Sequence, residues 1–452
     1  MGQNNVEKWD WKYTLFRKYV NFSFRCYLKS ITIHGKENIP DDSPVIFAPN
    51  HQNALMDALA LGYSIKDQPV FLARSDIFKK KIIARILTFL KILPIYRIRD
   101  GFENLKLNEH IMKKVREILL KHHCLVMFPE GNHGDKRQLR PLKKGITRIA
   151  FQSEEKCQYK LGIKIIPVGL DYSDYYRFNE ELFVNFGKPI DLTEFFDLYK
   201  ENPSKANLAL RNKLSEELKR YMVHIDVKEY YDTINQLRNL YPHKMQEYLN
   251  LPDLKQPNKF KADKKLIEIC ESIYSSSPEK LEKLSLVVKE YSENLRAEKL
   301  NHKEIINGIP PVYKILLETL FVILLFPVYI YGWINNLLSY FPAHSLSKKM
   351  KDPQFISSIK YGVGIITFPL FYLLQTILVY HLTNNILLSL IYLISIPLTG
   401  LLAFKYLKFF KRLKEKLRMR NFIRKKPKAY HKILILHRQI NNTIEKWAAS
   451  FT

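Results

Sequence analysis

Short apolar runs and longer amphipathic stretches alternate from about Ile31 to Phe195. The apolar runs have the length of buried strands and are rich in branched and aromatic residues, and they lie at 44–48, 70–73, 125–128, 164–168 and 182–186. The stretches between them are long enough for helices, which we expect near 54–65, 77–90, 105–121 and 145–153. Strands and helices that alternate at this spacing predict an α/β domain with a largely parallel sheet over residues 31–200.

The pattern changes after this domain, because no glycine occurs between Lys188 and Asn307 and because charged residues and leucines dominate the stretch. Prolines interrupt it at Pro203, Pro242, Pro252 and Pro278. We predict a helical insert over residues 201–307, in which we find no chemical motif.

Two hydrophobic blocks, 363–380 and 386–404, are each long enough to cross a bilayer as a helix. Only the short segment 381–385 separates them, so they predict a transmembrane hairpin over 363–404. Buried helices of a soluble core explain these blocks poorly, because such helices are rarely apolar on every face.

A third hydrophobic block, 315–341, precedes the hairpin and belongs with it to a membrane region over residues 308–404. It carries Glu318 near its start and both Pro327 and Gly332 inside. This composition predicts either a single crossing or a re-entrant helix that bends at Pro327.

The chain of 452 residues has 72 Lys and Arg against 44 Asp and Glu, which gives a formal net charge of +28. A hydrophobic content of 46% excludes a disordered tail. Almost half of the charge lies in residues 405–452, where 15 Lys and Arg accompany two Glu. We predict a polybasic cytoplasmic tail attracted to an anionic leaflet, at about 1 kcal/mol per cation. A nucleic-acid partner is not expected, because it would favour charge on a folded soluble face.

Aromatic and basic residues are interspersed between positions 8 and 28. They predict an interfacial amphipathic helix within residues 1–30, although a helix packed on the domain gives the same pattern. The segment lacks the apolar core of a secretory signal, so we expect a catalytic domain that faces the cytoplasm from the cytoplasmic membrane. The positive-inside rule places the tail and the loop 342–361 on that side and 381–385 on the other, which requires 315–341 to enter and leave by one face.

The four cysteines, Cys26, Cys124, Cys157 and Cys270, are far apart and form no C-x-x-C pair. This spacing argues against a disulfide scaffold and against the usual zinc and redox motifs. A reducing compartment is therefore expected.

The first segment with candidate chemistry runs from Asn50 to Asp57, directly after a predicted strand. On one helix, His51 and Asp57 would lie about 120° apart, so they meet only if His51 is in the preceding loop. We expect Asn53 to cap a helix that starts at Ala54. A carboxylate on one imidazole nitrogen fixes the tautomer and leaves the other nitrogen free to take a proton from a hydroxyl. By itself the pattern is weak, because a loop histidine beside an aspartate is more often structural.

The second segment runs from Phe128 to Asp135, again after a strand. Its Pro-Glu-Gly-x-x-Gly sequence predicts a flexible turn at the edge of the sheet, where α/β folds usually bind ligands. We expect Glu130 to accept hydrogen bonds from hydroxyls, and Lys143 and Lys144 to receive a phosphate. An ordinary polar loop is the alternative.

Together the segments resemble the glycerophospholipid acyltransferase family, whose blocks are N-H-x-S-x-x-D, an Arg-bearing block, F-P-E-G-T-R-S and a V-P-V-type strand. The matching residues here are Asn50, His51 and Asp57, then Pro94–Arg97, then Phe128–Gly131 with Pro141, Lys143 and Gly145, and finally Ile166–Val168. The resemblance covers roughly residues 30–195. It implies that His51 and Asp57 are catalytic and that Arg97 contacts the substrate phosphate. The implied substrate-binding set also contains Phe128, Pro129, Glu130, Gly131, Asn132, His133 and Lys143.

Two departures from the family pattern bear on the acceptor. Five residues rather than four separate His51 from Asp57, and Asn132-His133 replaces the Thr-Arg after FPEG. Both features resemble the subgroup that acylates glycerol 3-phosphate or dihydroxyacetone phosphate and carries membrane helices after the catalytic domain. Because His133 is no permanent cation, phosphate binding would rely on Arg97, Lys136, Arg137 or Lys143, and any help from His133 should fade as pH rises past ~6.5.

The resemblance therefore implies a membrane-bound O-acyltransferase of phospholipid biosynthesis. The acyl donor would be acyl-CoA or acyl carrier protein, the acceptor a small phosphorylated molecule, and neither a bound cofactor nor a metal is expected. The alternatives are acylation of 1-acylglycerol 3-phosphate, a lysophospholipid, and a non-enzymatic lipid-binding membrane protein. An intact pair of His51 and Asp57 argues against the non-enzymatic alternative.

Overall fold

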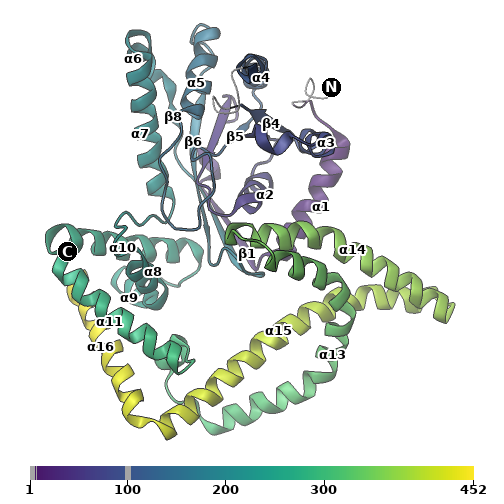
Figure 1. Ribbon diagram of the computed structural model, residues 1–452, viewed down its shortest axis with the longest axis vertical. Coiled ribbons are helices and arrows are strands. Elements are labelled where there is room, and N and C mark those ends of the chain that lie inside the picture. The colour runs from purple at the N-terminus through teal and green to yellow at the C-terminus, as the bar shows by residue number, and fades with distance from the viewer. Residues whose placement is uncertain (1–5, 7, 97–102, 452) are drawn as a thin grey trace. The chain divides into compact units, whose positions relative to one another are not determined.

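The computed structural model describes residue 6, residues 8–96 and residues 103–451 (Figure 1). Contacts between residues divide the chain into two compact units. The first contains the residues up to His224 together with Met350–Tyr361. The second contains Ile225–Lys349 and the residues from Gly362 onward.

An eight-stranded sheet forms the centre of the first unit, with the order β1-β7-β6-β2-β5-β3-β4 and with β8 paired to β6. The strands are β1 Ser30–His34, β2 Val45–Pro49, β3 Val70–Arg74, β4 Ile92–Ile95, β5 Leu125–Met127, β6 Lys164–Tyr172, β7 Glu181–Phe186 and β8 Ile190–Asp191. Only β7 and β8 run antiparallel to their neighbour β6, and the other pairs are parallel. The structure confirms the predicted α/β domain with a largely parallel sheet.

The helices of this unit lie before, between and after the strands. They are α1 Trp11–Tyr27, α2 Ala54–Ser64, α3 Lys81–Phe89, α4 Glu103–Leu120, α5 Gly145–Lys156, α6 Phe196–Glu201 and α7 Pro203–Tyr221. Ile46 and Ala48 of β2 belong to a core to which α4, α5 and α7 contribute. Phe47 points to the opposite face and is also completely buried. Burial on both faces explains why the central strands read as continuous apolar runs.

Three strands escaped the sequence analysis. The outer strand β1 has no fully buried residue and alternates apolar with polar side chains, so it contains no apolar run. At the other end of the sheet, β4 is four residues long and includes Pro94, which an edge strand tolerates. The two-residue β8 is too short to be recognised. The helix expected at 77–90 begins later, as α3, after a 3-10 turn at Ser75–Phe78.

The second unit contains a helical body that confirms the helical nature of the insert. Its helices are α8 Tyr231–Leu240, α9 Pro242–Tyr248, α10 Gln256–Ser276, α11 Pro278–Ala297 and α12 His302–Asn307. Pro242 and Pro278 occupy the first turns of their helices, where the missing N–H removes no helical hydrogen bond. In the structure α7, which follows residue 201, belongs to the first unit.

The basic tail is folded onto this body. It forms the end of α15 Ile386–Lys425 and all of α16 Pro427–Ala449. Apolar residues of α16, among them Ile440 and Trp447, are buried, and α16 packs against α11. Lys432 pairs with Glu290 at 2.7 Å. Part of the positive charge is therefore neutralised by the insert.

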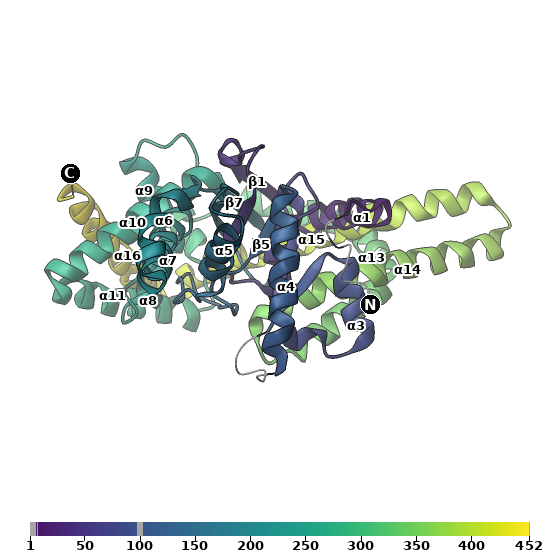
Figure 2. The ribbon, with the colours of Figure 1, turned by 90° about the horizontal axis from the view of Figure 1, so that it is seen from above.

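Among the described residues, three helices are long and apolar enough to cross a membrane: α13 Val312–Lys348, α14 Ile356–Thr383 and α15. Only Asn384 and Asn385 separate α14 from α15, as the predicted hairpin requires (Figure 2). The three helices agree with membrane association.

The partners of α13 show how it runs along the hairpin. Glu318 of α13 pairs with Lys416 of α15 at 2.6 Å, and further along α13 the side chain of Asn336 donates to the carbonyl of Ile396 at 3.1 Å. This part of α13 therefore runs along α15 toward the α14–α15 connection. Close contact is possible here because of Gly332, where a Cβ atom would lie 2.3 Å from the carbonyl oxygen of Thr399.

The remaining part of α13 follows α14 in the opposite sense. Gln375 donates to the carbonyl of Asn335 at 3.0 Å, and Thr367 donates to that of Ser339 at 2.8 Å. The contacted residues of α14 thus lie progressively further from the α14–α15 connection. Relative to the hairpin, α13 therefore reverses its direction near Asn335. Pro327 lies before this reversal, so the bend is not at the predicted position.

Candidate active site

The predicted pair of His51 and Asp57 is formed at the carboxyl end of β2. Nδ1 of His51 lies 2.9 Å from Oδ2 of Asp57. His51 is in the loop and Asp57 is in the first turn of α2, as expected from their spacing. Asp57 is almost completely buried, whereas the side chain of His51 retains 15% exposure. An ionised carboxylate at Nδ1 selects the tautomer with the proton on Nδ1 and leaves Nε2 as an acceptor.

The loop between these residues differs from the predicted cap. Asn53 stands at the N-cap position, but its side chain makes no capping hydrogen bond. Instead its backbone N–H donates to Oδ2 of Asp57 at 2.7 Å, the oxygen that also faces His51. Ala54 follows with a φ of +41°, which L-residues rarely adopt. One additional residue in the gap is thus accommodated by a left-handed step.

The turn after β5 supports the histidine loop from the opposite side. The ring of Phe128 stacks on that of His51, with centroids 4.0 Å apart. The N–H of Gly134 donates to the carbonyl of His51 at 2.9 Å. Parallel strands β2 and β5 end at the same edge of the sheet, so both segments converge there.

Glu130 has a different environment from the one predicted. Its side chain is buried, Oε1 accepts the backbone N–H of His51 at 2.7 Å, and Oε2 accepts both the N–H and the Nε of Arg140 at 3.1 Å. Burial raises the pKa of this carboxyl, and the N–H donors and Arg140 oppose the increase. Glu130 therefore holds the histidine loop to the second turn.

The other residues of the predicted binding set lie in or beside the same turn. Gly131 has a φ of +71°, and a Cβ atom there would lie 3.1 Å from the side chain of Lys143. The carbonyl of Pro129 accepts the N–H of Lys143 at 2.8 Å. Asn132 is exposed. These residues are brought together as predicted, whereas Arg97 lies outside the described residues.

His133 is half-buried between two aromatic rings. Its ring meets that of His51 edge-on at 5.5 Å and that of Phe355 at 4.6 Å. Burial, followed by the nearby His51 and Arg140, lowers the pKa of His133. The expected loss of its charge past pH ~6.5 therefore moves to lower pH.

Two arginines beside the turn were missed by the sequence analysis. Nη1 of Arg74 donates to Oδ1 of Asn132 at 2.5 Å, and Arg140 pairs with Glu130. Both cations contribute to the lowered pKa of His133. No motif distinguishes them in the sequence, because Arg74 is the last residue of the distant strand β3 and Arg140 lies between the two matched parts of the block that begins at Phe128.

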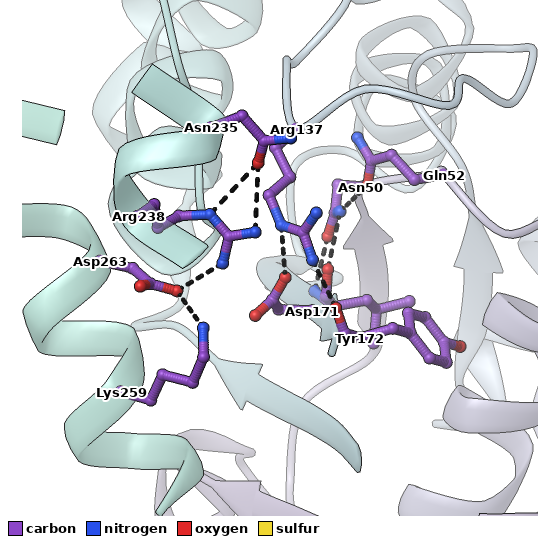
Figure 3. Close-up of polar contacts among 10 residues, drawn as sticks. Asn50, Gln52, Arg137, Asp171, Tyr172, Asn235, Arg238, Lys259 and Asp263 are labelled. Carbon is purple, nitrogen blue, oxygen red and sulfur yellow. Dashed lines mark hydrogen bonds and ion pairs between the residues drawn. The ribbon is translucent and has the colours of Figure 1, made fainter. Parts of the chain in front are cut away.

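Arg137, one of the expected phosphate-binding cations, is already engaged in a buried network (Figure 3). Its Nε donates to Asp171 at 3.2 Å, and its Nη2 donates to the carbonyl of Tyr172. Asn50 joins the loop to β6, because its side chain exchanges two hydrogen bonds with the backbone of Leu170. Arg137 and Asn50 therefore stabilise the strand ends. Within the described residues, no cluster of three or more His, Cys, Asp or Glu side chains is suited to a metal ion.

Comparisons with known proteins find similarity to one family over the domain that carries this site. Residues 30–171 match the model of the acyltransferase family. A stretch of 92 residues is 32% identical to an uncharacterized acyltransferase of Schizosaccharomyces pombe and covers 20% of this chain and 14% of that protein. Another, of 152 residues, is 28% identical to glycerol-3-phosphate O-acyltransferase 1 of Saccharomyces cerevisiae and covers 33% of this chain and 20% of that protein.

A bacterial relative is also similar over part of the chain. The 1-acyl-sn-glycerol-3-phosphate acyltransferase of Bacillus subtilis is 26% identical over 121 residues, which cover 26% of this chain and 56% of that protein. The matches thus span a minor part of the two yeast proteins and about half of the bacterial one.

Proposed function

We propose that this protein moves a fatty acyl group to a hydroxyl of glycerol 3-phosphate or dihydroxyacetone phosphate in glycerolipid synthesis, because residues 30–171 match the model of the acyltransferase family. The observation that carries the proposal is the contact of 2.9 Å between His51 and Asp57 at the edge of the sheet. Acyl-CoA or acyl carrier protein would supply the acyl group as a thioester, without a bound cofactor.

The geometry supports general-base catalysis by His51. Nε2 takes the proton of the acceptor hydroxyl while its oxygen attacks the thioester carbonyl carbon. Asp57 keeps the ring in the required tautomer and stabilises the imidazolium that forms. When the tetrahedral intermediate collapses, the carbon–sulfur bond breaks and the proton from His51 neutralises the thiolate. The acyl group passes directly to the acceptor, so the chain needs no acyl-enzyme.

The turn after β5 is the proposed site of the phosphate. The exposed side chain of Lys143 supplies a cation beside Gly131, and the turn has Arg74 and Arg140 nearby. We assign Arg97 to the same site on the resemblance of its block. Glu130 is assigned to positioning, because its two oxygens accept hydrogen bonds from the chain itself.

One relative favours a second acceptor. The name of the B. subtilis protein specifies 1-acyl-sn-glycerol 3-phosphate, and the match covers more of that protein than of the yeast proteins. Acylation of this lysophospholipid is therefore the second candidate. Purified protein in bilayers, supplied with labelled acyl donor and each of the three acceptors, distinguishes the candidates, and His51→Ala is the control.

We also propose that the catalytic domain lies at the cytoplasmic face of the cytoplasmic membrane. Trp9, Trp11 and Leu15 at α1 and Ile82 at α3 are 60–72% exposed. Contact between Phe16 of α1 and a ring of α3 at 5.7 Å joins the two helices into one apolar surface. Lysines at both helices would reach lipid phosphates while the apolar side chains enter the headgroup region.

The course of the chain supports one orientation for the membrane helices. Met350–Tyr361 belongs to the unit of the catalytic domain, so the start of α14 lies on the catalytic side. The insert joins the catalytic domain at His224 without a candidate span between them. Both ends of α13 are thereby assigned to the catalytic side, which agrees with its reversal near Asn335, and 381–385 is assigned to the other side.

A further inference from the structure

We propose that Ser357 and Ser358, at the start of α14, are positioning residues for the His51–Asp57 pair, so that the segment Met350–Tyr361 is part of the active site. The inference rests on the proposed function for its kinetic consequence. It concerns residues about 300 positions away from the histidine loop in the sequence.

The two serines hold the loop on either side of its left-handed residue. The Ser357 hydroxyl donates to Oδ1 of Asn53 at 2.6 Å, and the N–H of Leu55 donates to Oγ of Ser358 at 3.2 Å. Both serines are at least 94% buried. Ala54, between the two contacted residues, has the φ of +41°. The two serines thus stabilise a left-handed backbone conformation at Ala54, which an L-amino acid rarely adopts.

The loop conformation in turn places the catalytic carboxylate. The N–H of Asn53 donates to Oδ2 of Asp57 at 2.7 Å, and Nδ1 of His51 lies 2.9 Å from the same oxygen. If Asn53 rotates, this oxygen loses a donor and its alignment with His51 changes. We therefore assign to Ser357 an indirect role: it holds Asn53, and Asn53 holds the carboxylate that orients the imidazole of His51.

Further contacts fix the segment that carries the serines. Lys360 donates to the carbonyl of Tyr176 at 3.0 Å, and the Tyr361 hydroxyl donates to that of Val20 at 2.9 Å. At the other end of the segment, Phe355 meets the ring of His133 at 4.6 Å. The segment is thus attached at both ends to the catalytic unit. Because it connects two proposed membrane helices, attachment to the bilayer and the geometry of the catalytic pair are coupled.

The test uses the full chain in lipid nanodiscs and compares Ser357→Ala, Ser358→Ala and the double variant with the parent. Ser389→Ala is the matched control, because Ser389 is also buried and its hydroxyl donates to a backbone carbonyl in α15. We expect kcat of the double variant to fall on the order of 10-fold. The KM values for the acyl donor and for the acceptor should each change less than about twofold, because a misaligned imidazole affects the transition state more than substrate binding. Ser357→Thr keeps the hydroxyl, so its kcat should be close to that of the parent and above that of Ser357→Ala.

Hydrogen exchange gives a second readout that does not need turnover. The peptide 50–58 should exchange faster in the double variant, and Ser389→Ala should leave it unchanged. If the double variant fails to fold, Ser357→Cys, which keeps the volume and weakens the hydrogen bond, replaces it. Parental kcat and exchange in a folded variant, or a loss that appears only in KM, would overturn the inference. If the parent acylates none of the acceptors, the proposed function fails, and exchange still decides the positioning of the loop.

Discussion

The carboxylate of Asp57 and the imidazole of His51 meet at 2.9 Å because the backbone takes a left-handed step at the residue between their loop and helix. Oδ2 of Asp57 also accepts the N–H of Asn53, so the carboxylate is held by the loop that it orients. This mutual support explains how a five-residue gap still yields a paired histidine and aspartate.

Removing the base should abolish acyl transfer without loss of the protein from membranes. We expect His51→Ala to lower kcat by ~10²–10⁴-fold, the usual contribution of a general base. Asp57→Asn should also lose much of the rate, because an amide can favour the wrong imidazole tautomer. Radiolabelled acyl transfer by purified variants measures both effects. Turnover of His51→Ala close to that of the parent would contradict the mechanism.

Glu130→Gln should distinguish positioning from substrate binding. A carboxylate accepts hydrogen bonds at two oxygens, whereas the glutamine amide has one oxygen and one NH2 group. Either His51 or Arg140 therefore loses its acceptor. We therefore expect kcat to fall at least about tenfold, with the acceptor KM nearly unchanged. Steady-state kinetics with varied acceptor provide the measurement. A raised KM at parental kcat would instead assign Glu130 to the acceptor.

The charge of His133 should matter only in acidic solution. Its pKa is lowered by burial and by neighbouring cations, so the protonated form that attracts phosphate is lost as pH rises through a range below the ordinary value of about 6.5. The acceptor KM should climb in that range and be flat above it, apart from the second ionisation of the phosphate itself. His133→Arg should remove the climb, because guanidinium stays charged. Identical KM profiles for parent and variant would exclude His133 as a phosphate ligand.

Cysteine labelling in sealed vesicles tests the proposed orientation. In a chain freed of its four cysteines, single cysteines at Lys303, Lys351 and Lys428 should react from one side and a cysteine at Asn384 from the other. The reason is that α13 reverses near Asn335 and that α14 and α15 form a hairpin. Labelling of positions 303 and 351 from opposite sides would show that α13 crosses the bilayer completely, whereas labelling of positions 351 and 428 from opposite sides would contradict the hairpin.

Tryptophan quenching tests whether α1 enters the headgroup region. A variant that keeps only Trp11, which is 60% exposed, should be quenched by brominated lipids, more strongly when the bilayer is anionic. A variant that keeps only Trp447, which is buried against the insert helices, serves as the matched control. Equal quenching of the two would favour an α1 that merely packs on the domain.

The sequence was most informative where the burial of a strand, or the spacing of two residues along the chain, determines the local structure. The central strand β2 is apolar throughout because both faces of the sheet are covered. The spacing of His51 and Asp57 indicated that they meet only if His51 lies in the loop before the helix, and the resemblance to a family added the catalytic role. The prediction that the side chain of Asn53 caps α2 was wrong, because this side chain instead accepts a hydrogen bond from Ser357, which lies about 300 residues later. The positioning role of Glu130 was equally hidden, since a carboxylate after a strand gives no sign of which N–H groups will face it. Such contacts depend on tertiary packing, which local periodicity does not encode.

The glycine in α13 also restricts how lipids move near the enzyme. At Gly332 the backbones of α13 and α15 approach so closely that even a methyl group would collide with the carbonyl of Thr399. A hydrocarbon chain is about as thick as a methyl group, so an acyl chain has no passage between the two helices at this position. In a bilayer, lipid chains would therefore surround the pair of helices here and would not lie between them.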